Sequence, residues 1–193
     1  MITVYVKKIA NITESEKQSI IASLSQAARE RLNKKRNGAL RLASLCALSL
    51  LNDEQRKNID YNENGSPYFQ NLNAEISISH SQTHVAIAVS DSRNTTVGVD
   101  IEDITSKPIS TRFLTENEKS LAINATEFIN IWTKKEALFK FLKNGYTPFI
   151  HLDSTTPELY DAHFTVMQIE SSILTICTKI NEKIEITIQE KKP

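Results

Sequence analysis

The chain has 193 residues, of which 40% are hydrophobic and 24% charged, and its 23 lysines and arginines balance its 23 acidic residues. A chain of this size can bury roughly 70% of the surface that its unfolded form exposes, which is enough for one domain or two closely packed halves. Five prolines, four glycines and the lack of any low-complexity tract exclude a disordered or flexible multidomain chain.

The N-terminus lacks the basic and apolar regions of a signal peptide, and no apolar run approaches the length of a membrane span. We therefore expect a cytoplasmic protein without a membrane partner. Cys46 and Cys177 lie in apolar surroundings and are predicted to be small core residues.

Periodicity and turn signals predict helices and strands along the whole chain. A strand is expected at 2–6, followed by helices at 14–33 and 37–51 and a loop at 62–67. Two or three strands then lead to residues 97–102. A short helix from residue 116, a helix at 128–143 and strands at 164–169, 173–179 and 184–189 follow. This mixture in both halves predicts the α+β class.

Positive charge is concentrated in the run RERLNKKRNGALR at 29–41. The cations of this run are Arg29, Arg31, Lys34, Lys35, Arg36 and Arg41. They indicate an anionic partner. Nucleic acid is disfavoured because the chain is neutral as a whole and the run lacks interleaved aromatic residues. For any one of these cations, a solvated position near a helix C-terminus is an equally good interpretation.

A polar centre, SHSQTH, lies between two strand-like apolar segments in residues 76–90. Taken alone, His80 has the ordinary interpretation of a histidine at a turn or strand end, because its pKa near neutrality suits many roles. His84 has no supporting neighbours and is predicted to lie at the surface.

Two further segments carry acids and lysines in a suggestive order. In VGVDIED at 97–103, apolar residues alternate with Asp100 and Glu102, so both carboxylates project from one face of a strand. In the helix at 128–143, Glu136 and Lys140 share a face, with Lys135 a step around the cylinder. Carboxylate oxygens suit Mg²⁺, and lysines suit phosphate oxygens, so the set predicts magnesium-assisted chemistry on a phosphate.

Local patterns also give a structural interpretation to one nearby acid. Thr115 followed by Glu118 is a capping box, in which the two side chains satisfy backbone N–H groups at a helix start. Thr13 and Glu16 repeat the pattern for the first helix. We therefore interpret Glu118 as structural.

Five motifs in one order resemble the 4'-phosphopantetheinyl transferases. They are Gly65-Ser66-Pro67, the strand ending in Ser79-His80-Ser81, Gly98-Val99-Asp100-Ile101-Glu102, FLTENE from Phe113 to Glu118, and WTKKEALFK from Trp132 to Lys140. They span about residues 64 to 145, and the likeness is closer to the long, single-chain surfactin-synthetase-activating type than to the short trimeric holo-acyl-carrier-protein synthase type. Ser66 and Gln82 depart from the lysine and glycine that many relatives have there, which affects the expected coenzyme A contacts but not the acids.

The resemblance implies a transferase with holo-acyl-carrier-protein synthase activity. Such an enzyme moves the phosphopantetheine arm of coenzyme A to a serine of an apo acyl or peptidyl carrier protein and releases adenosine 3',5'-bisphosphate. Asp100, Glu102 and Glu136 would then hold Mg²⁺, Glu136 would accept the serine proton, and Lys140 and Lys135 would balance phosphate charge. Coenzyme A binding would involve Gly65 and Pro67, Ser79 and His80, and the cations Lys35, Arg36 or Arg41.

The same resemblance implies two similar α+β halves related by a pseudo-twofold axis, 1–95 and 96–193, with a boundary in 90–96 and a monomeric state. Fatty acid, polyketide and nonribosomal peptide carriers are all open. Two alternatives also stay open: a catalytically weak module that binds coenzyme A or a carrier protein, and another magnesium-dependent enzyme that cleaves pyrophosphate in a nucleotide.

Overall fold

The computed structural model describes residues 1–10, 12–104, 110–143 and 147–189. Within these ranges the largest sheet, the β1 sheet, contains in order β4 (Ile76–His80), β5 (His84–Ser90), β1 (Ile2–Lys8) and β9 (Ile184–Gln189). The β6 sheet contains β6 (Gly98–Asp103), β8 (Ser172–Thr178) and β7 (His163–Ile169). A hairpin pairs β2 (Ile59–Tyr61) with β3 (Pro67–Phe69).

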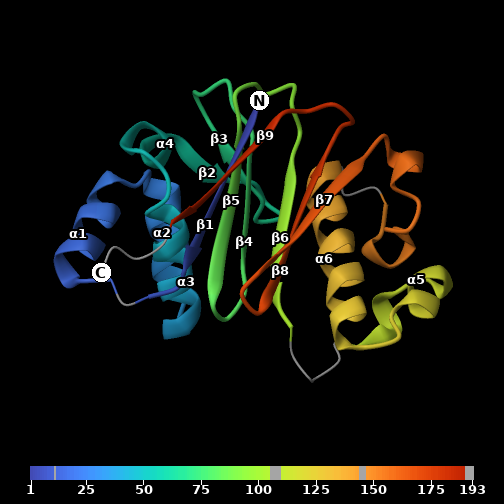
Figure 1. Cartoon of the computed structure of the whole chain (residues 1–193). Coiled ribbons are helices and arrows are strands. Elements are labelled where there is room, and N and C mark those ends of the chain that lie inside the picture. The colour runs from blue at the N-terminus through green and yellow to red at the C-terminus, as the bar shows by residue number, and fades with distance from the viewer. Residues whose placement is uncertain (11, 105–109, 144–146, 190–193) are drawn as a thin grey trace.

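Helices cover the outer faces of the two sheets, as Figure 1 shows. They are α1 (Glu14–Ser23), α2 (Gln26–Lys34), α3 (Gly38–Leu48), α4 (Asp53–Asn58), α5 (Glu116–Leu121) and α6 (Ala125–Leu142), with short 3-10 helices at Thr111–Phe113, Phe149–His151 and Pro157–Tyr160. The mixture of helices and sheets confirms the predicted α+β class. None of the helices described here is long and apolar enough to cross a bilayer.

The layers follow from the alternation of side chains along the strands. On β5, Val85 and Ile87 face the core under α1, α2 and α3, whereas Ala86 and Ala88 face the β6 sheet. These two small residues let the β1 and β6 sheets approach closely, with Val99 and Ile101 of β6 in the same cluster. Both faces of β5 are therefore covered, which explains why all its residues are buried.

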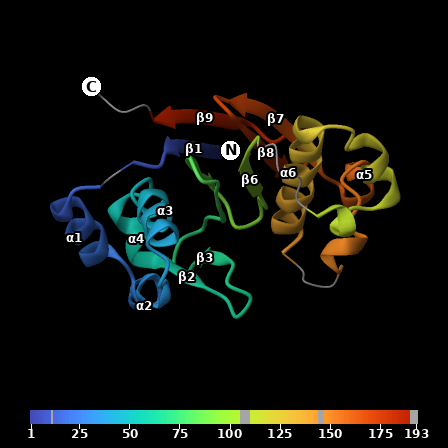
Figure 2. The ribbon, with the colours of Figure 1, turned by 90° about the horizontal axis from the view of Figure 1, so that it is seen from below.

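The first and last strands of the chain are neighbours. β1 pairs in parallel with β9 and antiparallel with β5. Figure 2 shows β9 beside β1 at one edge of the molecule. The strand that ends the predicted second half thus completes a sheet of the first half. The pseudo-twofold axis and the division into two halves stay predictions.

The predicted helix at 14–33 is two helices. Leu24 is extended between α1 and α2, and Ser25 caps α2 by accepting a hydrogen bond from the amide of Ala28 at 3.1 Å. The Ser25 hydroxyl also donates to the carbonyl of Ile59, which ties the break to the β2–β3 hairpin. The capping boxes of Thr13 with Glu16 and Thr115 with Glu118 are confirmed.

Candidate active site

Helix α6 lies directly on strand β6 at Gly98. A Cβ atom built on Gly98 would lie 1.9 Å from the carbonyl oxygen of Ala137 and 2.7 Å from the amide nitrogen of Phe141. Only glycine therefore allows this approach of helix to strand. The approach faces the acidic side of β6 toward Glu136 and Lys140 of α6.

Asp100 is the centre of the contacts between β6, α6 and β4. Its side chain is buried, and Oδ1 accepts hydrogen bonds from the Lys140 ammonium and the Ser79 hydroxyl, each at 2.6 Å. Lys140 also donates to Ser79 Oγ and to the Val99 carbonyl, both at 3.1 Å. Asp100 Oδ2 is buried and has no hydrogen-bond partner among the described residues.

The two glutamates predicted as metal ligands are half-buried close to Asp100. Burial, followed by the nearby Asp100 carboxylate, raises the pKa of Glu102 to about 8, against the opposing charge of Lys140. Burial also raises the pKa of Glu136, with Lys140 opposing and Asp100 adding to the shift. The Asp100 carboxylate therefore raises the pKa of both glutamates, and the charge of Lys140 opposes both shifts.

This carboxylate cluster, Asp100, Glu102 and Glu136, fits a divalent cation by its chemistry. All its donors are oxygens, one of them is buried without a partner, and a nearby cation would favour the ionised form of both glutamates. Among the described residues no three acidic, histidine or cysteine side chains already stand in a metal-binding arrangement. These three residues would be the protein ligands of such an ion, and the metal assignment stays a proposal.

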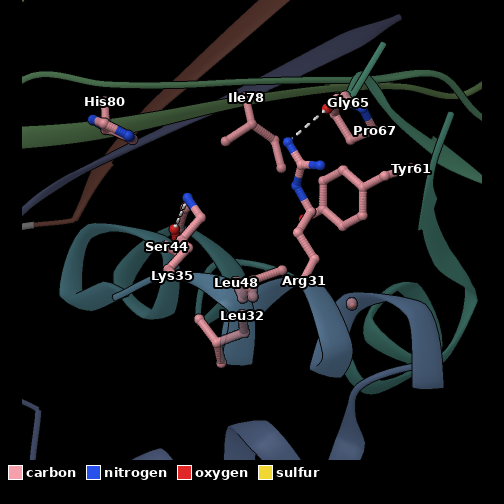
Figure 3. Close-up of a pocket in the computed structure, with 12 residues that line it drawn as sticks. Arg31, Leu32, Lys35, Ser44, Leu48, Tyr61, Gly65, Pro67, Ile78 and His80 are labelled. Carbon is pink, nitrogen blue, oxygen red and sulfur yellow. Dashed lines mark hydrogen bonds between the residues drawn. The ribbon is translucent and has the colours of Figure 1, made fainter. Parts of the chain in front are cut away.

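A separate pocket of ≈ 170 Å³ lies between α2, α3, the β2–β3 hairpin and β4. Figure 3 shows Arg31, Lys35 and His80 around it. None of the described residues that line it is acidic. Such a pocket, which we call the cationic pocket, suits a phosphate group.

The cations of this pocket are held by neutral neighbours. Arg31 lies 4.4 Å from the ring centre of Tyr61 and donates to the Gly65 carbonyl at 3.2 Å, and Lys35 donates to Ser44 Oγ at 2.6 Å (Figure 3). Burial, followed by the charge of Arg31, lowers the pKa of Lys35. Burial, followed by the charge of Lys35, lowers the pKa of His80. An anion bound among these groups would relieve their mutual repulsion.

Gly65 has a conformation that explains its place in the motif. Its φ is +82°, and a Cβ there would lie 2.7 Å from the Arg31 guanidinium. Glycine adopts this φ without strain and leaves the space that Arg31 fills. Pro67 follows at the start of β3 and lines the same pocket.

Strand β4 connects the cationic pocket to the carboxylate cluster. Successive side chains of a strand point to opposite faces. His80 therefore lines the pocket, whereas Ser79 points to Asp100 and Lys140. Both residues were predicted to bind coenzyme A, and in the structure they have different neighbours.

Lys135 requires a correction. Its side chain is fully buried and forms an ion pair with Glu118 at 2.7 Å, and it also donates to the Leu152 carbonyl. A lysine enclosed in this way is not available to balance phosphate charge, so its predicted catalytic role is wrong. The structural interpretation of Glu118 is confirmed, because this acid also caps α5 and accepts from the amide of Ser154 at 2.9 Å.

Other predicted residues lie outside the two regions. Arg36 is exposed, and Arg41 donates to Asn33 Oδ1 at 3.4 Å; the lining of the cationic pocket includes neither. His84 is buried with 3% exposure, so the prediction of a surface position is wrong. Cys46 and Cys177 are buried, as predicted.

Arg31 lines the pocket, although the resemblance implied only Lys35, Arg36 or Arg41 of the basic run as contacts to coenzyme A. It lies four positions before Lys35, so the two share one face of α2 and its C-terminal end. That spacing within the basic run was the available signal. Ser44 and Tyr61 gave no comparable signal, because only tertiary packing brings them to the pocket.

Comparison with known families finds a match to part of the chain. A model described as the 4'-phosphopantetheinyl transferase superfamily matches residues 96–188, a segment that holds all three acids of the carboxylate cluster. The search of curated proteins finds no match. The match confirms the predicted superfamily, and the long, single-chain type stays a prediction. Residues 96–188, slightly less than half of the chain, are thus similar to the 4'-phosphopantetheinyl transferase superfamily.

Proposed function

We propose that the protein transfers the 4'-phosphopantetheine group of coenzyme A to a serine of an apo carrier protein, with Mg²⁺, and releases adenosine 3',5'-bisphosphate. The similarity of residues 96–188 to the superfamily supports phosphopantetheine transfer in general. One observation carries the proposal: adjacent residues of β4 serve both regions, His80 in the cationic pocket and Ser79 at Asp100. A substrate with phosphates at two places suits this arrangement.

The cationic pocket is the proposed site of the nucleotide end of coenzyme A. Arg31 can bind a phosphate through two N–H groups, and Lys35 offers a compact positive charge beside it. His80 adds a ring nitrogen on the opposite wall. The 3'-phosphate is the group of coenzyme A that best matches these three donors.

The carboxylate cluster is the proposed site of the reacting pyrophosphate. Asp100, Glu102 and Glu136 would hold Mg²⁺, which when bound neutralises charge on the pyrophosphate as a Lewis acid. Lys140 fixes Asp100 through their ion pair and brings a positive charge close to the reacting oxygens. A carboxylate oxygen of Glu136 is the proposed acceptor of the serine proton.

The carrier protein is proposed by class. Acyl and peptidyl carriers of fatty acid, polyketide or nonribosomal peptide synthesis present the serine that this chemistry needs. The cytoplasmic location, expected from the lack of a signal-peptide pattern, and the monomeric state, implied by the resemblance, remain predictions.

Intact-mass spectrometry of apo carrier proteins incubated with the protein and coenzyme A tests the proposal. We expect a mass gain of one phosphopantetheine group with Mg²⁺ and none with a chelator. A carrier whose acceptor serine is replaced by alanine is the control and should gain nothing. Absence of transfer to every carrier class, with coenzyme A binding intact, would instead support a binding module.

A further inference from the structure

The last residue of β6, Asp103, holds the turn that follows β4. Its Oδ1 accepts hydrogen bonds from the hydroxyls of Ser81 at 2.8 Å, Thr83 at 2.5 Å and Ser172 at 2.6 Å. Its Oδ2 accepts from the backbone amide of Gln82 at 3.0 Å. We call these five residues the Asp103 latch. It joins the β4–β5 turn to the start of β8 through one carboxylate.

Buried His84 completes the latch. Thr83 and Ser172 each give their one hydroxyl hydrogen to Asp103, so each can only accept from His84 Nδ1, which lies at 2.8 Å and 3.1 Å from them. This count of hydrogens places a proton on Nδ1 of His84. His84 thereby supports the two hydroxyls that hold Asp103, which explains why it is buried.

The latch matters because β4 is an edge strand. In the β1 sheet β4 pairs with β5 on one side, and within the described ranges no backbone ladder joins β4 to β6. Side chains make this junction: Ser77 Oγ accepts from the Val99 amide at 3.0 Å, and Ser79 donates to Asp100. The Asp103 latch adds the contact at the end of the strand, directly after His80.

The two strands joined in this way carry the two parts of the proposed site. Asp100 and Glu102 lie on β6 just before Asp103, and His80 lies on β4 just before Ser81. We propose that Asp103 is a positioning residue that fixes His80, and with it the nucleotide end of coenzyme A, relative to the carboxylate cluster. The role of Asp103 in transfer rests on the proposed function, whereas its hydrogen bonds to the β4–β5 turn do not.

Asp103→Asn is the sharpest variant, because it keeps the size of the side chain but removes the charge and places an NH₂ group among donors. Asp91→Asn is the matched control, because Asp91 is an exposed aspartate that pairs with the N-terminal amine. Ser172→Ala tests the latch from outside the turn. All three proteins are compared with the unaltered protein below their unfolding temperatures.

Two measurements separate positioning from simple stability. Hydrogen exchange of peptides that cover residues 81–84 should accelerate about tenfold in Asp103→Asn and less in Ser172→Ala, because each latch contact contributes only part of the local stability. The KM for coenzyme A should rise about tenfold while the KM for the carrier stays unchanged, because a small displacement at the phosphate reduces productive binding. Loss of folded protein alone lowers apparent kcat and leaves both KM values unchanged.

Unchanged exchange in Asp103→Asn, or an unchanged KM for coenzyme A with only kcat reduced, would overturn the proposal. If the unaltered protein transfers nothing to any carrier, the proposed function has failed, and exchange alone then decides whether Asp103 holds the turn. Asp91→Asn should match the unaltered protein in both measurements.

Discussion

The Lys140 ammonium and the Asp100 carboxylate form an ion pair of 2.6 Å that joins α6 to β6. Asp100 is nearly enclosed, with 3% of its side chain exposed, whereas Lys140 keeps 27% of its own surface exposed. The same ammonium reaches Ser79 on β4. Lys140 therefore connects the helix and the two strands that carry the proposed site, and one side remains open to a substrate.

Replacing this lysine tests its double role. Lys140→Met should lower kcat about 100-fold, because it removes a fixed positive charge beside the reacting oxygens. It should also lower the free energy of unfolding by about 2 kcal/mol, less than for a fully enclosed pair because Lys140 is partly exposed. Steady-state transfer and denaturant titration measure the two effects, with Lys134→Met on the same helix as control. Normal turnover in Lys140→Met would remove Lys140 from the mechanism.

Gly98 should tolerate no side chain. Gly98→Ala places a methyl group against the backbone of α6, so we expect a loss of about 3 kcal/mol in the free energy of unfolding. Transfer should fall further than stability explains, because Glu136 and Lys140 move away from Asp100. Gly38→Ala is the control, since a Cβ on Gly38 meets nothing within 4 Å. Equal stability of the two variants would contradict the observed packing.

The Lys135–Glu118 pair is expected to stabilise the fold without a part in transfer. Lys135→Met leaves the Glu118 carboxylate buried and unpaired, which should cost about 3–5 kcal/mol. Adding Glu118→Gln should restore part of that loss. Denaturant titration gives the stabilities, and kcat per folded molecule should stay near normal. A stable Lys135→Met protein without transfer would restore the catalytic role first predicted for this lysine.

Local patterns predicted those features that depend on neighbours along the chain. Alternation along β6 placed Asp100 opposite the valines, and the capping box identified Glu118 as structural. Features that depend on distant partners were missed. Helical spacing placed Lys135 one step from Glu136, but its burial depends on Glu118 and Leu152, each 17 residues away. The order of side chains around α6 was predictable from the sequence, whereas the distant residues that pack against them were not.

The same limit explains the broken helix and the buried histidine. Residues 14–33 contain no proline or glycine, so nothing local marked the break that Ser25 makes through its bond to Ile59. His84 was predicted at the surface because no neighbouring motif supported a functional role for it. In the structure His84 is buried, and its Nδ1 forms a hydrogen bond with the hydroxyl of Ser172, which lies 88 residues away in the sequence.

His80 predicts how pH affects nucleotide binding. Burial and the charge of Lys35 lower the pKa of His80 from its usual value of 6.5. At His80 the folded protein therefore binds fewer protons than the unfolded protein. The free energy of unfolding that this difference contributes is lost as the pH falls below about 6.5. A bound phosphate would raise that pKa again, so binding should take up a proton. Calorimetry of adenosine 3',5'-bisphosphate in buffers of different ionisation enthalpy should detect this uptake.

His80→Gln is the control for that uptake. Ionisation of the ligand phosphates is common to both proteins, so it cancels in the comparison. The proton uptake of the unaltered protein near pH 6.5 should exceed that of His80→Gln. Equal uptake in both proteins would place the phosphate away from His80.

The rate at which an apo carrier protein gains mass from coenzyme A shows whether the carboxylate cluster drives phosphopantetheine transfer. The unaltered protein and Glu127→Gln, a change of a partly exposed acid on the first turn of α6, should modify the carrier at similar rates with Mg²⁺. Asp100→Asn and Glu136→Gln should fold but modify it at least about 100-fold more slowly. Near-normal mass gain with either of these two variants would contradict the account.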